Sequence, residues 1–185
     1  MEKAKEEYIN IEDEEVIKDD KYKVIDKYIN DTYQKDYKIA LGICCIIISL
    51  SSPMLIQRYY STLLTGIAAI IWIALNIVGI ILIVKAIKGY NIRSYTFPVL
   101  PLEYKNHLYN NYYLSYLRQG KRLKTIGILL CVFCLLPAML FNDLNESLFD
   151  LGNALFFIMI AMGVFLIKIS SSKTKAYKYI LNIKK

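Results

Sequence analysis

The chain has 185 residues, of which 56% are hydrophobic, and a formal net charge of +7 at pH 7. Four long uncharged runs occupy so much of it that little remains for a separate soluble domain. The chain has one histidine, His107, and lacks a glycine-rich phosphate loop, an HExxH motif and a GxSxG motif. The composition therefore argues against a large soluble domain, and the absent motifs argue against an enzyme.

The chain begins with a polar segment that precedes the first apolar run. Residues 1–20 are acidic and poor in large apolar side chains, which predicts a mobile segment. Between residues 21 and 38, apolar side chains recur at helical spacing among lysines and aspartates: Tyr22, Ile25, Tyr28, Ile29 and Tyr33. This spacing predicts an amphipathic helix that leads into a membrane. We favour a helix lying at the membrane surface over a helix dedicated to binding a partner.

Two uncharged runs follow, residues 39–56 and 61–84. A hydrocarbon core of about 30 Å needs roughly 20 apolar residues in a helix, with about 17 as the lower limit, so each run can cross a membrane. Residues 57–60 separate the runs and carry the cation and aromatic rings typical of a membrane interface. A buried helix pair in a soluble core is the alternative, but a soluble helix normally keeps one polar face. We expect residues 21–88 to form the amphipathic helix and a transmembrane hairpin.

Few polar side chains lie inside this hairpin. Asn76 is the one strongly polar side chain well inside a span. An amide in lipid commonly hydrogen-bonds to a neighbouring helix, which contributes about 0.6–2 kcal/mol, and we prefer this role to lining a pore. Ser49, Ser51 and Ser52 precede Pro53, where hydroxyls can satisfy the backbone carbonyls freed at a kinked helix end. Asn76, Ser49 and Ser52 are therefore candidates for helix packing or, in the rival interpretation, for a pore.

Residues 89–120 form a cytoplasmic linker rich in tyrosine. Pro98 and Pro101 enforce an extended or turn conformation, because proline disfavours helix in the residue before it. A second amphipathic helix is expected from residue 102 to about residue 117. Four tyrosines lie close to one face of it and are candidates for contacts with the membrane interface or a partner: Tyr109, Tyr112, Tyr113 and Tyr116. Residues 120–122, Gly-Lys-Arg, are expected to separate this helix from the third span.

A second pair of uncharged runs, residues 125–141 and 151–167, resembles a looser copy of the first pair. The alignment matches residues 42–43 with 127–128, 54–56 with 139–141 and, after a small shift in register, 79–83 with 163–167. Each pair crosses the membrane and returns, so a tandem duplication would give both hairpins the same orientation, a parallel repeat. We expect residues 121–168 to form the second hairpin and residues 169–185 to form a basic tail.

The charges are unevenly distributed along the chain. Residues 85–124 hold eight Lys or Arg against one acid, and the tail from Lys168 holds six lysines and no acid. Short segments rich in Lys and Arg stay on the cytoplasmic side of a cell membrane, so both termini and the linker should lie inside. Anionic lipids of the inner leaflet explain these cations and their flanking tyrosines, at roughly 1 kcal/mol per cation, better than nucleic acid does.

The four cysteines, Cys44, Cys45, Cys131 and Cys134, all lie inside expected spans. The Cys-x-x-Cys spacing at residues 131–134 is found in metal and redox sites. However, no His, Asp or Glu lies nearby in the sequence to complete such a site, and small apolar thiols suit helix packing in lipid. We therefore expect no metal, no cofactor and no redox chemistry.

Residues 41–56, which read LGICCIIISLSSPMLI, resemble a membrane segment common in Firmicutes. There a lead rich in Tyr and Lys precedes a run of the form LGxxLCIxSxxPLI, and a second helix ends much as residues 160–167, IAMGVFLI, do. In that family the hairpin is similar to the membrane tail of some helix-turn-helix regulators and to small membrane proteins of unassigned role. The abundant Ile, Lys, Asn and Tyr also suit a low-GC bacterium. The present chain departs from the family by having two hairpins and no room for a DNA-binding head, which argues against direct regulation.

Together these patterns predict an all-α integral membrane protein with four transmembrane helices in two tandem hairpins. Amphipathic cytoplasmic helices are expected before the first and third spans. Because no ionisable residue lies inside a span, we expect a non-enzymatic accessory or scaffold subunit, or a sensor of membrane state, acting with a membrane-protein partner or as a homo-oligomer. The alternatives are an oligomeric transporter or channel component, with Asn76 and residues 49–52 along the path, and an immunity protein against membrane-active peptides.

Overall fold

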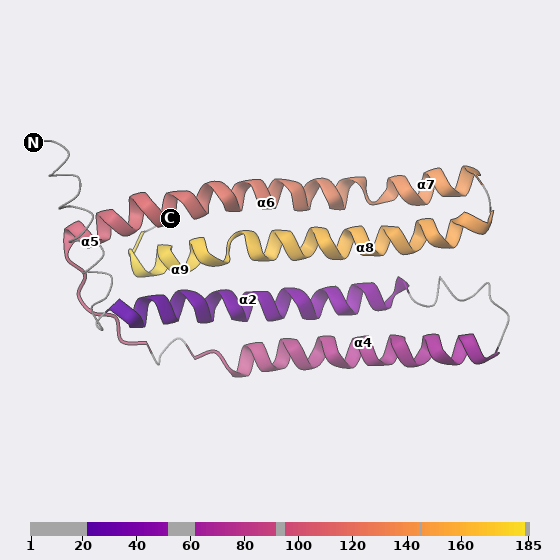
Figure 1. Ribbon diagram of the computed structural model, residues 1–185, viewed down its shortest axis with the longest axis horizontal. Coiled ribbons are helices and arrows are strands. Elements are labelled where there is room, and N and C mark those ends of the chain that lie inside the picture. Colours follow the sequence, from indigo (N-terminus) through magenta and orange to yellow (C-terminus); the bar gives the residue numbers. More distant parts are fainter. Residues whose placement is uncertain (1–21, 52–61, 92–94, 145, 184–185) are drawn as a thin grey trace, which may run out of the picture.

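The computed structural model describes residues 22–51, 62–91, 95–144 and 146–183 (Figure 1). Every regular element in these ranges is a helix, which confirms the all-α prediction. The expected mobile segment, residues 1–20, lies outside the described residues, as do Ser52, Pro53 and the polar turn at residues 57–60.

The helices follow one another in a simple order. The first half of the chain forms two long helices, α2 (Lys23–Ser49) and α4 (Thr62–Lys88). The second half begins with a nearly continuous rod of α5 (Leu102–His107), the π-helical segment η3 (Leu108–Tyr113), α6 (Leu114–Phe133) and α7 (Leu135–Leu144). The chain then returns along this rod through α8 (Glu146–Ser170) and α9 (Ser172–Ile180).

The long helices lie side by side in one layer, in the order α6, α8, α2, α4, with neighbours antiparallel (Figure 1). The most extensive contacts join α2 to α4 and α6 to α8, followed equally by those of α2 and of α7 with α8. Consequently α2 and α8 occupy the middle of the layer, and α4 and α6 form its edges. α2 and α4 form one antiparallel hairpin, and the rod and α8 form a second; the two hairpins touch through α2 and α8.

Three helices in the described part of the chain are long and apolar enough to cross a membrane: Gly66–Lys88, Leu102–Phe141 and Leu151–Ile180. Many of their apolar side chains face outwards; Ile70 is 69% exposed and Leu140 is 62% exposed. Such exposure is unfavourable in water, because apolar surface left in water costs about 25 cal/mol per Å² relative to burial. Hydrocarbon chains remove that cost, so the exposed surface is compatible with a membrane protein.

The helix α2 joins the expected amphipathic helix and the first apolar run without a break. It is not among the three apolar helices, because the part of it that is both uncharged and described is too short. This part begins after Lys38, which follows Lys35 and Asp36, and the described segment ends at Ser51. The apolar half nevertheless lies in the layer beside α4 and α8, where Ala40 is fully buried.

One expectation about the linker is wrong. Residues 120–122 do not separate the linker helix from the next apolar run, because α6 continues through Gly120. Glycine serves there as a contact point, since a Cβ at Gly120 would clash with the carbonyl oxygen of Ser170 on α8. The rod breaks later, after Phe133, where the ring of Pro137 would meet the carbonyl group four residues earlier in a regular helix.

Candidate functional site

One end of the layer is a packed aromatic core, which we call the aromatic head. It is built from the start of α2, residues 95–101, the segment from α5 to the first turns of α6, and α9 (Figure 1). Its buried side chains are Ile25, Tyr28, Ile29, Leu100, Leu108, Ala176, Tyr177 and Ile180. Further rings surround them, from Tyr22, Tyr90, Tyr95, Phe97, Tyr104, Tyr112, Tyr113 and Tyr116. Since Ile25, Tyr28 and Ile29 are 0%, 3% and 7% exposed, the favoured placement of this helix face at the membrane surface is wrong.

Ring contacts connect segments of the head that are distant in the sequence. Tyr28 packs edge-on against Tyr95 and Phe97, with ring centroids 5.2 and 5.0 Å apart. Tyr22 stacks on Tyr104 with centroids 4.2 Å apart. Such pairs contribute about 0.5–1.5 kcal/mol each beyond the area that they bury. The head therefore fixes the start of α2 against the linker.

The four candidate tyrosines of the linker lie on η3 and at the start of α6. Tyr112 and Tyr116 both stack on Tyr177 of α9, with centroids 6.1 and 5.6 Å apart. Tyr113 packs against the buried core and stacks with Tyr109, which is 40% exposed. Short π-helical segments are frequent at functional sites. Three of the four tyrosines thus help to build the head, and Tyr109 is the most accessible of the four.

Polar side chains of the head are hydrogen-bonded to one another. The Tyr95 hydroxyl donates to the carboxylate of Asp31, and the hydroxyls of Thr32 and Tyr90 share a bond of 2.9 Å. Ser172 donates to the carbonyl oxygen of Thr32 at 3.3 Å, which ties α9 to α2. Burial raises the pKa of Tyr95 to about 12, and the bond to Asp31 adds to the rise. The Tyr95 hydroxyl is therefore a stable donor at neutral pH.

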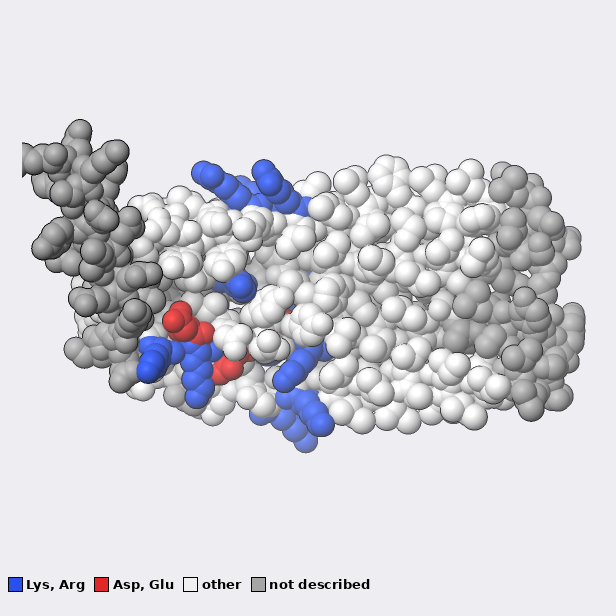
Figure 2. Space-filling view, viewed as in Figure 1, with Lys and Arg blue, Asp and Glu red and all other residues white. Residues whose placement is uncertain are grey.

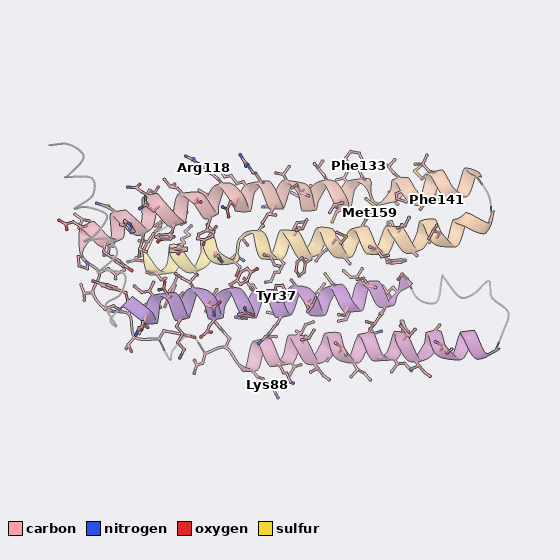
Figure 3. The ribbon with its side chains drawn as sticks, viewed as in Figure 1. Tyr37, Lys88, Arg118, Phe133, Phe141 and Met159 are labelled. Atoms are coloured by element: carbon pink, nitrogen blue, oxygen red, sulfur yellow. The ribbon has the colours of Figure 1, made fainter. Side chains whose placement is uncertain are left out.

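Lys and Arg side chains gather in a band between the head and the apolar part of the layer (Figure 2). Lys88 ends α4 at one edge of the layer, and Arg118 lies on α6 at the other edge (Figure 3). In the middle helices, Lys168 pairs with Asp36 at 3.3 Å, and Asp36 is only 8% exposed. Beyond the band, the described residues on the face in Figure 2 show no charged side chain. The band therefore coincides with the head-side end of the apolar surface.

Asn76 lies within the apolar part of α4 and joins it to α2. Its Nδ2 donates to Ser49 Oγ at 2.9 Å and to the carbonyl oxygen of Trp72 at 2.8 Å. Ser49 is fully buried, and its hydroxyl donates to the carbonyl oxygen of Ile46 at 2.6 Å. This cross-helix bond favours the helix-packing interpretation of Asn76 over the pore interpretation. Ser52, the third member of the candidate set, lies outside the described residues.

A glycine pair brings the two helices of each hairpin into close approach. A Cβ added to Gly42 would lie 2.6 Å from the carbonyl oxygen of Gly79, and the reverse distance is 2.7 Å. A Cβ added to Gly127 would lie 2.7 Å from the carbonyl oxygen of Gly163, and the reverse distance is again 2.7 Å. A side chain at any of these four positions would push the helices apart, and small residues are what close helix contacts in membranes require.

The cysteines contribute to helix packing. Cys44 donates from its sulfur to the carbonyl oxygen of Ala161 at 3.0 Å, a contact between α2 and α8. Cys134 donates to the carbonyl oxygen of Cys131 at 2.9 Å within the rod, and both of these thiols are free. No group of three or more His, Cys, Asp or Glu in the described ranges could hold a metal ion.

The chain matches no protein-family model, no curated protein and no solved structure. The sequence patterns missed two parts of the head, namely residues 95–101 and the helix α9. For α9 a signal existed, because Ala176, Tyr177 and Ile180 have the spacing of one helix face. For residues 95–101 none existed, since a segment without regular structure has no periodicity.

Proposed function

We propose that the protein spans a cell membrane four times, as two tandem hairpins of the same orientation, with the head and both termini in the cytoplasm. Three spans would be formed by α4, by the rod from residue 125 to 141 and by α8. The fourth would be the uncharged run at residues 39–56, of which residues 39–49 lie in α2. The band of Lys and Arg beside the head supports this orientation, because such residues stay on the cytoplasmic side.

Equivalent contacts in the two hairpins support an origin by duplication. The contact of Gly42 with Gly79 and Ile83 corresponds to the contact of Gly127 with Gly163 and Ile167. Apolar sequences align with one another easily, so the alignment alone is weak support. A shared contact between helices that are separate in the sequence is stronger support, because it requires two matched positions in each copy.

We infer that the protein is a non-enzymatic scaffold or accessory subunit that holds a partner at the membrane through the aromatic head. The head itself carries this proposal. Its core is continuous with α2, α6 and α8–α9, so it is fixed relative to the apolar layer. Its linker side exposes apolar surface, with Val99 98%, Leu102 75% and Tyr109 40% exposed. Exposed apolar side chains on a rigid support are typical of interaction surfaces.

A second role, as a sensor of membrane state, is favoured by the continuity of α2. One helix runs from the buried Ile25 of the head to the buried Ser49 beside α4. A change in its tilt within the membrane would move the head by the same rotation. The two roles differ in whether the partner is bound permanently or only in one state of the membrane.

The scaffold role can be tested by photocrosslinking in native membranes. A photoreactive residue in place of Tyr109 should yield one dominant foreign protein. The same residue in place of Ile80, which is 54% exposed on the outer surface of α4, should yield lipid. Mass spectrometry identifies the adducts. Crosslinks from position 109 only to lipid or to a second copy of the chain would contradict the scaffold role and favour a sensor or an oligomeric pore.

A further inference from the structure

A small cavity lies where α6 passes the junction of α8 and α9, at the level of the band of cations. Its volume is about 180 Å³. The side chains that matter for its chemistry are the cation Lys173, the polar groups of Gln119 and Thr174, the rings of Tyr33 and Tyr116, and the apolar Leu123. None of the described residues that line it is acidic. The cavity is thus positively charged, and beside its polar groups it has an apolar wall formed by Leu123 and Ile169.

Lys173 lacks an acidic partner in the described part of the structure. Its ammonium lies 4.6 Å from the ring centroid of Tyr116 and 5.3 Å from that of Tyr33. Its hydrogen bond to the Tyr116 hydroxyl is long, at 3.4 Å. An ammonium has three donors, so two remain for a ligand. By contrast, the nearby Lys168 is already paired with Asp36.

The depth of the cavity matches the headgroup layer of a membrane. At 1.5 Å per residue, Leu123 lies about 3 Å outside the third uncharged run, which starts at Thr125. Lys173 lies about 9 Å outside the fourth run, which ends at Ile167. The polar layer on each side of a bilayer is roughly 5–7 Å thick. Leu123 therefore lies near the hydrocarbon boundary. The backbone of Lys173 lies about 2–4 Å outside the headgroup layer, from where its long side chain can place the ammonium at the headgroups.

We propose that this cavity binds the phosphate group of an anionic phospholipid from the inner leaflet. Lys173 supplies the charged hydrogen bonds, Gln119 and Thr174 supply neutral ones, and Leu123 contacts the start of the acyl chains. The proposal rests on the membrane topology proposed above and is independent of the scaffold role. Free phosphate shares the same chemistry, but it would leave the apolar wall without a contact.

The test uses the full chain in nanodiscs of equal parts phosphatidylcholine and phosphatidylglycerol. Native mass spectrometry after release from the nanodisc counts the lipids that stay bound. The wild-type protein should retain one phosphatidylglycerol. Lys173→Gln should reduce this retention at least fivefold, because it removes the charged hydrogen bonds to the phosphate. The matched control is Lys175→Gln, which removes an exposed lysine of the same helix and should change retention less than twofold.

Several results would overturn the proposal. Equal losses in the Lys173 and Lys175 variants would mean diffuse surface charge, and equal retention of phosphatidylcholine and phosphatidylglycerol would mean that the cavity does not select an anionic lipid. If Lys173→Gln fails to fold, Thr174→Val, which keeps the shape of the side chain, should still lower retention. Added inorganic phosphate should leave the lipid bound; Lys173-dependent displacement by phosphate would instead identify a soluble ligand and overturn the lipid assignment. Failure to enter nanodiscs would refute the topology and would be visible before any lipid is counted.

Discussion

The close approach of α2 and α4 predicts that a single methyl group at Gly79 destabilises the protein. In Gly79→Ala the new Cβ would lie 2.7 Å from the carbonyl oxygen of Gly42 and 2.8 Å from Cγ1 of Ile46. Non-bonded carbon contacts normally lie at about 3.5–4.0 Å, so the helices must separate by roughly 1 Å. Overpacking of this kind costs about 1–3 kcal/mol. Alanine recovers about 1 kcal/mol through its helix propensity, which leaves a net loss of up to about 2 kcal/mol.

Gly66→Ala on the same helix is the matched control, because a Cβ there meets no atom within 4 Å. It gains the same helix propensity without the clash, so the two variants should differ by about 1–3 kcal/mol. Unfolding by SDS in mixed micelles can be followed through the fluorescence of Trp72, the only tryptophan, which lies between the two glycines. Equal midpoints for the two variants would refute the glycine contact. Gly163→Ala, in the second hairpin, should behave like Gly79→Ala if the hairpins are copies.

Three further predictions concern polar contacts. Asn76→Ala should cost about 0.6–2 kcal/mol in the SDS titration. The cost should be smaller in a Ser49→Ala background, because the bond between the two side chains is already absent there and only the bond of Asn76 to Trp72 remains; additive losses would contradict the bond to Ser49. Lys168→Gln should cost about 1–3 kcal/mol of stability, because it leaves the carboxylate of Asp36 buried without its cation. The control Lys175→Gln, at an exposed lysine, should change stability by less than about 0.5 kcal/mol. Similar values for both variants would show that the ion pair does not contribute to stability. The raised pKa of Tyr95 stabilises the folded state below the ordinary tyrosine pKa of 10.0, and this contribution is lost as the pH rises from there to about 12. In an ultraviolet titration of the folded protein, Tyr95→Phe should therefore remove an absorbance change centred near pH 12, and removal of a change near pH 10 would contradict the burial of Tyr95.

The apolar helices could be predicted from the sequence because nearly every residue in them is apolar, so that no face of the helix has to be distinguished from another. The uncharged run at residues 61–84 corresponds to α4, and the run at residues 151–167 lies within α8. Length and the absence of charge are sufficient for this prediction, and no knowledge of neighbouring helices is needed. The contact of Asn76 was predictable for a related reason, since an amide on an apolar helix has few other partners. The partner, Ser49, is close in the folded chain because α2 and α4 pack side by side.

The aromatic head could not be predicted from the same kind of pattern. A tyrosine at the end of a span has the same sequence context whether it lies in the headgroups or in a protein core. The spacing of Ile25, Tyr28 and Ile29 identified the apolar face of α2, but it did not identify what covers that face. The covering residues, such as Phe97 and Tyr177, come from segments far along the chain. Only the packing of α9 and the linker onto α2 distinguishes the two cases.

Side-chain size accounts for the placement of α2 and α8 in the middle of the layer and of α4 at its edge. In a membrane, lipid is as apolar as leucine, so hydrophobicity does not decide which helices touch, and close packing does. The two middle helices carry small buried residues along their length: Ala40 and Cys44 on α2, and Ala154 and Ala161 on α8, all at most 7% exposed. The outer surface of α4 instead carries branched side chains that are about half exposed or more, including Ile70, Ile73, Ile77 and Ile80. These bulky chains hold a neighbouring helix at a distance but are readily solvated by lipid. On the proposed topology, the rigid aromatic surface of the head would face water, so we expect a protein partner there rather than at the edges of the layer.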